Sequence, residues 1–158
     1  MNVFLIAGSG ERGVVRDGAN RKVPLPTPHS LYFLDLPGYG YARASKSERT
    51  AFRGLVKHAL QREWLRGVVW LLDIRHRPSA DDQAMQDTLA EGSAPVLAAL
   101  TKADKLSTVE RRAREQELRA DLELPDDQIV VTSAKTGEGI VELQDAIGEL
   151  IQGTRGAE

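Results

Sequence analysis

Residues 96–104 read VLAALTKAD, a run of apolar residues that leads straight into a polar tetrapeptide. The same arrangement recurs at residues 31–38, LYFLDLPG, and at residues 129–135, IVVTSAK. Apolar runs this short and continuous predict strands that are covered by helices on both faces of a sheet. Ligands bind beyond the carboxyl ends of the strands in open α/β sheets, so the residues after these runs are the first candidates for a binding site.

Helical patterns separate these strands. Asn2–Ala7 and Val68–Leu72 are two further apolar runs that predict strands. Serine followed three positions later by Glu or Asp forms a capping box, which begins a helix, and this pattern starts at Ser45, Ser79 and Ser107. A last helix is predicted after Gly139, with one apolar stripe formed by Ile140, Leu143, Ile147, Leu150 and Ile151. From residue 31 onward strand and helix alternate four times, which predicts an α/β fold with a doubly wound, mostly parallel sheet flanked by helices.

The composition limits the class of protein. The chain has 158 residues, of which 41% are hydrophobic and 28% charged, and this predicts one globular domain over residues 1–152 with a frayed tail at residues 153–158. No cysteine is present, which excludes disulfide bonds and zinc–thiolate sites and fits a cytoplasmic location. No apolar run approaches the roughly 18 residues of a membrane span, so no membrane partner is expected. Gly8–Ser30 is rich in glycine, proline and charge, and is expected to be a mobile loop between the first two strands.

Charge is unevenly distributed along the chain. The formal net charge is −2, but Tyr41–Arg77 contains nine Lys and Arg residues against three Asp and Glu residues. Such a segment indicates either a surface that faces RNA or another acidic partner, or ordinary solvated helix faces. Both interpretations remain open from the sequence.

The residues after three of the strands match motifs of nucleotide hydrolases. Asp35 and Gly38 have the DxxG spacing in which the carboxylate holds Mg²⁺, usually through water, and the glycine amide meets the terminal phosphate. The same two residue types also occur in ordinary turns. Thr101–Asp104 is similar to the [NT]KxD guanine-recognition motif, whose carboxylate accepts hydrogens from guanine N1 and N2 while the lysine stem lies over the purine. Ser133–Lys135 matches the loop whose backbone N–H contacts the guanine oxygen, so three motifs in order predict guanine-nucleotide binding.

Longer stretches around these motifs resemble one family of small GTP-binding proteins. Four stretches are similar to the EngB family: DLPGYGYA at residues 35–42, SKSER at residues 45–49, LDIRH at residues 72–76 and LTKADKLS at residues 100–107. The resemblance covers roughly residues 31–152. It implies a P-loop NTPase-like fold that uses GTP or GDP and Mg²⁺. It also implies a GTPase that acts in assembly of the large ribosomal subunit, with rRNA as a partner, and that is needed for normal septum formation in dividing bacteria.

The same resemblance assigns the site residues. By it, the nucleotide would be held by Asp35, Leu36, Pro37, Gly38, Thr101, Lys102, Ala103, Asp104, Thr132, Ser133 and Ala134. Asp35 would also lie near Mg²⁺, through water. The candidate rRNA-facing residues are Arg43, Lys46, Arg49, Arg53 and Arg75.

The sequence departs from the family at its amino end. Nothing in the chain reads G-x-x-x-x-G-K-[ST], the loop that wraps the phosphates and supplies a lysine and a Mg²⁺-binding hydroxyl. Asn2–Ile6 aligns with the family's second strand, so we expect the chain to begin after the phosphate loop, the first helix and switch I. The family's first strand, which is central, would then be missing, and Leu31–Leu36 and Val68–Leu72 would each have an unpaired, buried edge. On this basis the chain alone is expected to fold poorly and to be unable to hydrolyse GTP. Tight GTP binding is not expected either, because the triphosphate contacts that give much of the affinity are missing.

Two other functions fit parts of the sequence. Gly8–Gly13 spells G-x-G-x-x-G, the fingerprint of a Rossmann-type dinucleotide enzyme, but that fingerprint requires a helix after Gly13 and Val14–His29 has no helical pattern. The second alternative is a nucleotide-free, degenerate paralogue that serves as an interaction module.

Overall fold

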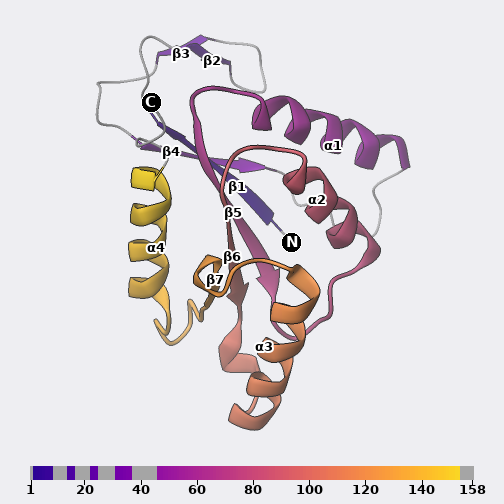
Figure 1. The fold of residues 1–158 in the computed structure, drawn as a ribbon, viewed down its shortest axis with the longest axis vertical. Helices are drawn as coiled ribbons and strands as arrows, with labels where there is room; N and C mark the ends of the chain where they lie inside the picture. The colour runs from indigo at the N-terminus through magenta and orange to yellow at the C-terminus, as the bar shows by residue number, and fades with distance from the viewer. Residues whose placement is uncertain (1, 9–13, 17–21, 25–30, 37–45, 154–158) are drawn as a thin grey trace.

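A five-stranded mixed sheet forms the centre of the protein (Figure 1). The computed structural model describes residues 2–8, 14–16, 22–24, 31–36 and 46–153. The sheet has the order β4-β1-β5-β6-β7, and its strands are β1 (Asn2–Gly8), β4 (Leu31–Leu36), β5 (Leu65–Asp73), β6 (Val96–Thr101) and β7 (Ile129–Val131). The helices are α1 (Lys46–Leu60), α2 (Ala80–Ala90), α3 (Thr108–Leu122) and α4 (Ile140–Gly153), with short 3₁₀ turns at Ala103–Lys105 and Asp126–Gln128.

The helices cover both faces of the sheet, as the continuous apolar runs predict. Side chains of α1, α2 and α3 pack on one face in a cluster with Trp70, Leu72 and Leu100. Side chains of α4 pack on the other face against Val69 and Leu97. Alternate residues of β5 and β6 therefore belong to different clusters, because successive side chains of a strand point to opposite faces. Figure 1 shows α4 on one side of the sheet and α1 and α2 on the other.

From β4 onward strand and helix alternate four times, so the predicted α/β order is confirmed. Two of the predicted capping boxes are also present. The side chain of Ser79 accepts from the backbone N–H of Asp82, and that of Ser107 accepts from the backbone N–H of Glu110, with the reciprocal bonds in place at both. Helix α1 begins at Lys46, whereas Ser45 lies outside the described residues. No helix among residues 2–8, 14–16, 22–24, 31–36 and 46–153 is long and apolar enough to cross a membrane.

The prediction of an unpaired edge on Val68–Leu72 is wrong, whereas Leu31–Leu36 is the outermost strand of the five-stranded sheet and pairs on one side only among the described residues. Strand β1 lies between β4 and β5 and pairs antiparallel with both, with Leu5 opposite Leu34 on one side and Val68 on the other. The remaining neighbours, β5 with β6 and β6 with β7, are parallel, so the sheet is mixed rather than mostly parallel. The gap expected beside Val68–Leu72 is therefore filled by β1, and the physical reason given for poor folding no longer applies to that strand.

The expectation of a loop without regular structure over Gly8–Ser30 is also wrong in part. Gly8 ends β1, and β2 (Val14–Arg16) pairs antiparallel with β3 (Lys22–Pro24) in a separate two-stranded sheet. A strand, not a helix, thus follows Gly13. The Rossmann-type interpretation requires a helix N-terminus to hold the pyrophosphate, and the structure contradicts it.

Candidate nucleotide site

The ends of β6 and β7 bring two of the predicted motifs together. These strands are parallel neighbours, so the residues that follow them leave the sheet at the same edge. Backbone hydrogen bonds fix the two segments to each other: Ala103 N donates to Thr132 O at 3.1 Å, and Thr132 N donates to Leu100 O at 2.8 Å. Thr132 and Ala103 are both buried, so Asp104 and Ser133 extend from a rigid base.

Asp104 and Ser133 form the polar centre of this site. The Ser133 hydroxyl, which is fully buried, donates to Asp104 Oδ1 at 2.7 Å. It also accepts from Thr136 N at 3.2 Å, so its orientation is fixed from both sides. The Ser133 bond, more than burial or the charge of Lys105, controls the pKa of Asp104 and holds it below its ordinary value. Asp104 is therefore an ionised, oriented carboxylate at neutral pH.

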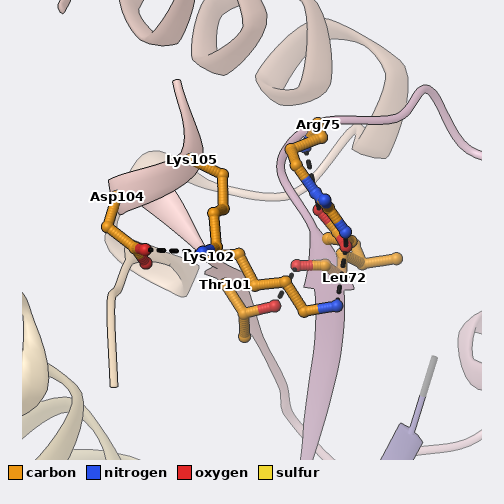
Figure 2. Close-up of polar contacts among 7 residues, drawn as sticks. Leu72, Arg75, Thr101, Lys102, Asp104 and Lys105 are labelled. Carbon is orange, nitrogen blue, oxygen red and sulfur yellow. Dashed lines mark hydrogen bonds and ion pairs between the residues drawn. The ribbon is translucent and has the colours of Figure 1, made fainter. Parts of the chain in front are cut away.

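The second oxygen of Asp104 is an unsatisfied acceptor. Oδ2 is buried and has no hydrogen-bond partner among the described residues, although Lys105 Nζ lies 3.6 Å away. Figure 2 shows this contact between Asp104 and Lys105. A buried carboxylate oxygen without a donor is costly, and such atoms in native proteins call for a ligand, an ion or water.

The loop after β7 contains a backbone donor next to Ser133 in the sequence. Ser133 N donates to Glu138 O and Gly137 N donates to Ser133 O, both at 2.9 Å, which closes the loop on itself. Gly139 ends the loop with φ +69°, and a Cβ there would lie 1.9 Å from Val131 O, so only glycine fits. Ala134 is exposed at the tip, and its N–H donates to no acceptor in the part of the chain that the structure describes.

Lys102 crosses from β6 toward β5. Its backbone is left-handed, with φ +64°, an uncommon conformation for a residue other than glycine. Its Nζ donates to Asp73 Oδ2 at 2.9 Å, and Asp73 also accepts from the Arg75 guanidinium at 2.7 and 2.9 Å (Figure 2). The Arg75 bonds, supported by Lys102, hold the pKa of Asp73 far below its ordinary range. Thr101, the first residue of the motif, donates its hydroxyl to Leu72 O at 3.0 Å.

Sequence reasoning missed Asp73. It lies within the LDIRH stretch that supports the family resemblance, but no motif assigns it a role. Its position as the last residue of a buried strand was the available signal, because β5 ends at the same edge as β6. Arg75 was expected to face rRNA; in the structure its guanidinium is paired with Asp73.

Asp35 lies apart from this cluster. Strand β4 ends at the same edge as β5, but two strand spacings away, about 10 Å across the sheet. Asp35 pairs with Phe4, and Phe4 pairs in turn with Val69, so Asp35 is level with Val69. Val69 lies four positions before Asp73, which places Asp35 and Asp73 about 13 Å apart along the strand direction. Asp35 is exposed and Leu36 half-buried, while Pro37 and Gly38 lie outside the described residues.

Asp35 is the described residue that was expected to lie near Mg²⁺. Within residues 2–8, 14–16, 22–24, 31–36 and 46–153, no three His, Asp or Glu side chains are grouped as metal ligands. Mg²⁺ bound with a nucleotide uses one or two carboxylates plus phosphate oxygens and water, so Asp35 alone fits the protein's share of such a site.

Most of the side chains expected to face rRNA are not among those that the structure describes. Arg43 and the side chains of Lys46 and Arg49 are not described. Arg53 is half-buried on α1 and lines a groove between α1 and α2 with Lys57, Asp87 and Glu91. Lys57 pairs with Glu91 across this groove at 2.7 Å, so acidic and basic side chains are mixed there.

Comparison with known proteins identifies several relatives that share one description. No family model matches the chain. A protein of Gemmatimonas aurantiaca described as "Probable GTP-binding protein EngB" is 46% identical over 124 residues, which are 78% of this chain and 61% of that protein. A protein of Syntrophomonas wolfei with the same description is 46% identical over 121 residues, 76% of this chain and 62% of that protein. The chain thus spans about three fifths of the length of the curated relatives it matches.

A solved structure agrees with the fold. The crystal structure of a probable GTP-binding protein engB superposes with a TM-score of 0.63, covering 74% of each chain at 21% sequence identity. At that identity the match supports the α/β architecture alone.

Proposed function

We propose that this chain, which belongs to the EngB family of GTP-binding proteins by homology over about three quarters of its length, binds guanine nucleotides at the ends of β6 and β7. In this proposal Asp104 recognises the base edge, Ser133 orients Asp104, and the Ala134 amide donates to the guanine oxygen. Thr101, Ala103 and Thr132 support the two loops, and Lys102 contacts the face of the purine.

The observation that carries the proposal is the buried, unpartnered Oδ2 of Asp104. Guanine offers two adjacent donors, at N1 and at the exocyclic N2, on the edge that a carboxylate can accept. Oδ1 already accepts from Ser133, which leaves one of its lone pairs and all of Oδ2 for the base. Adenine has no donor at N1, so the same carboxylate would stay partly unpaired with adenine and would disfavour it.

A second feature near Asp104 supports a guanine base over purines that lack an oxo group. Ala134 is exposed and directly follows Ser133, and its N–H donates to no acceptor among the described residues, so we propose it as the donor to the purine oxo group. In this proposal the Asp104 carboxylate accepts from the two donors of guanine, and the Ala134 N–H donates to its one oxo acceptor. A site without an oriented carboxylate would not favour guanine over adenine in this way.

The test is nucleotide binding by the wild-type chain and by Asp104→Asn, measured by titration calorimetry with GDP, XDP and ADP. The wild-type chain is expected to prefer GDP over both competitors. Asp104→Asn is expected to lose about 100-fold in GDP affinity, because two hydrogen bonds to a charged acceptor are lost, and to prefer XDP, whose 2-oxo group accepts from the introduced amide.

The control is Asp126→Asn, which removes a carboxylate that is 91% exposed in the turn before β7 and should leave all three affinities unchanged. Equal binding of GDP and ADP by the wild-type chain, or GDP binding by Asp104→Asn at the wild-type level, would contradict the proposal.

The resemblance to the family extends the proposal beyond base recognition. We propose that residues 1–152 act as one domain, that Asp35–Gly38 faces the phosphates with Asp35 toward Mg²⁺, and that the protein acts with GTP in assembly of the large ribosomal subunit. Co-sedimentation with large ribosomal subunits tests the partner. GTP-dependent co-sedimentation is expected, nucleotide-independent co-sedimentation would favour the interaction-module alternative, and no co-sedimentation would exclude both.

A further inference from the structure

We propose that Asp73 is a positioning residue: it holds Lys102 in place against the purine face, and so sets how tightly the site holds any purine nucleotide. This proposal rests on the guanine-nucleotide binding proposed above, and adds a residue on β5 to a site otherwise built on β6 and β7.

The two oxygens of Asp73 divide their contacts between two cations. Oδ1 accepts from Arg75 N at 3.1 Å and from Arg75 Nε at 2.9 Å. Oδ2 accepts from an Arg75 terminal nitrogen at 2.7 Å and from Lys102 Nζ at 2.9 Å. The Asp73 side chain is only 14% exposed. Three bonds from Arg75 thus fix the carboxylate, and the fixed carboxylate holds Lys102.

Lys102 needs such an anchor to hold one conformation. Its side chain is 53% exposed, and a lysine stem with four rotatable bonds loses much conformational entropy when it is ordered. Its left-handed backbone directs the chain at the turn between β6 and Asp104. Figure 2 shows Lys102 extending to the polar group at Arg75, with Asp104 on the other side of Lys102 in that view. A base bonded to Asp104 would therefore meet the Lys102 stem, because the two side chains leave the same turn.

The contact made by Lys102 differs in kind from that made by Asp104. A carboxylate reads the hydrogen-bonding edge of the base, whereas an alkyl stem packs on the face of the ring, which all purines share. Losing the anchor should therefore lower affinity for every purine nucleotide by the same factor. Losing Asp104 should change which purine is preferred.

A competing explanation is that Asp73 only ties the end of β5 to the turn after it through Arg75. In that case its removal would affect binding in the same way whether or not Lys102 is present. A second competing effect is electrostatic, since neutralising Asp73 leaves Arg75 free to attract phosphate. A double-mutant cycle between Asp73 and Lys102 separates these two effects from the proposed one. Both competing effects of Asp73→Asn would persist when Lys102 is changed, whereas the loss of the Lys102 anchor would not.

The experiment measures GDP and IDP binding by the wild-type chain, Asp73→Asn, Lys102→Met and the double variant. Methionine keeps an apolar stem but cannot pair with Asp73. We expect Asp73→Asn to weaken GDP and IDP binding by about fivefold each, with the GDP:IDP ratio unchanged, and to have no further effect in the Lys102→Met background. Glu91→Gln, which breaks the Lys57–Glu91 pair of 2.7 Å between α1 and α2, is the matched control and should change neither affinity.

A ligand-free measurement separates this proposal from the function on which it rests. Relaxation of the Lys102 side-chain methylene groups by NMR should show an ordered stem in the wild-type chain and a mobile one in Asp73→Asn. An unchanged Lys102 signal, or equal effects of Asp73→Asn in both backgrounds, would overturn the positioning role while leaving guanine binding intact. A wild-type chain that binds neither nucleotide would overturn both.

Discussion

The two halves of one sheet edge differ in how firmly they are built. In the half formed by β5, β6 and β7, parallel neighbours deliver Asp73, Thr101 and Thr132 to the same edge, and hydrogen bonds tie their loops together. In the half formed by β4 and β1, the strand that separates Asp35 from β5 runs in the opposite direction. Asp35 is exposed there and stands level with Val69, well before the end of β5.

This difference indicates that the two parts of the predicted nucleotide site are not equally prepared. Parallel strands with short carboxyl-terminal loops preorganise polar groups, because each loop is fixed by the neighbouring one. An antiparallel strand brings its amino end, Asn2 and Val3, to the same edge instead of its carboxyl end. The half formed by β5, β6 and β7, which we propose recognises the base and call the base-recognition half, lies within the described residues, whereas Asp35 is the described residue proposed for the phosphate side.

The largest effect should come from removing a core side chain of β1. Leu5 is 1% exposed and packs in the cluster shared with α1, α2 and α3, so Leu5→Ala is expected to lower the free energy of unfolding by about 3 kcal/mol. Phe33→Ala on β4 is the control: Phe33 is 54% exposed, and its loss should cost less than about 1 kcal/mol. Urea denaturation of the three proteins measures both. If Leu5→Ala cost no more than Phe33→Ala, β1 would not be a central strand.

The meeting of the loops after β6 and β7 could be predicted from sequence because its determinants are local. The apolar run over residues 96–100 and the polar residues directly after it specify a strand and its carboxyl end together, and the Ser107 capping box then begins α3. Ser133 follows β7 in the same way. Once two strands are parallel neighbours, the residues after them are brought together without further information.

Three features could not be predicted, two of them because they depend on contacts between distant segments. An apolar strand such as Asn2–Ala7 fits an edge or a central position equally well, and only competition for hydrogen-bonding partners places it between β4 and β5. The pairing of Val14–Arg16 with Lys22–Pro24 lies in a segment of turn-forming residues with no alternation. The contact between Asp73 and Lys102 spans 29 positions, and no motif connects them.

An intermediate effect is expected at Ser133. Ser133→Ala removes the donor that orients Asp104, and GDP affinity should fall about tenfold, or about 1.4 kcal/mol, because a hydrogen bond to a charged group is lost. Ser107→Ala is a matched control, since Ser107 donates to Glu110 at 2.6 Å much as Ser133 donates to Asp104 at 2.7 Å.

The two serine variants should differ in what they change. Ser107→Ala should lower the free energy of unfolding by about 1 kcal/mol through loss of the α3 cap and leave GDP affinity unchanged. Calorimetric titration and urea denaturation of both variants test this. A GDP affinity that fell equally in both would mean that the Ser133 hydroxyl acts only through stability.

The smallest effect concerns backbone strain and returns to the same half of the edge. Lys102 and Glu123 are the residues other than glycine with positive φ in the described ranges, at +64° and +52°. Glu123 ends α3, where glycine is the usual residue, so Glu123→Gly should raise the free energy of unfolding by about 0.5 kcal/mol. Lys102→Gly relieves a similar strain but also removes the ion pair with Asp73, worth about 0.5 kcal/mol, so urea denaturation should show no net gain.

The proposed role of Lys102 gives a reason why lysine is present at a position that favours glycine. Strain at position 102 is offset by the Asp73 contact, whereas strain at Glu123 has no such compensation in the contacts that the structure describes for α3. Lys102→Gly should therefore weaken GDP binding while Glu123→Gly should leave it unchanged, as calorimetric titration would measure. If Lys102→Gly were as stabilising as Glu123→Gly and bound GDP as the wild-type chain does, the Asp73–Lys102 pair would contribute neither to the fold nor to the site. The geometry of the base-recognition half would then have to come from Asp104, Ser133 and the loop backbone alone.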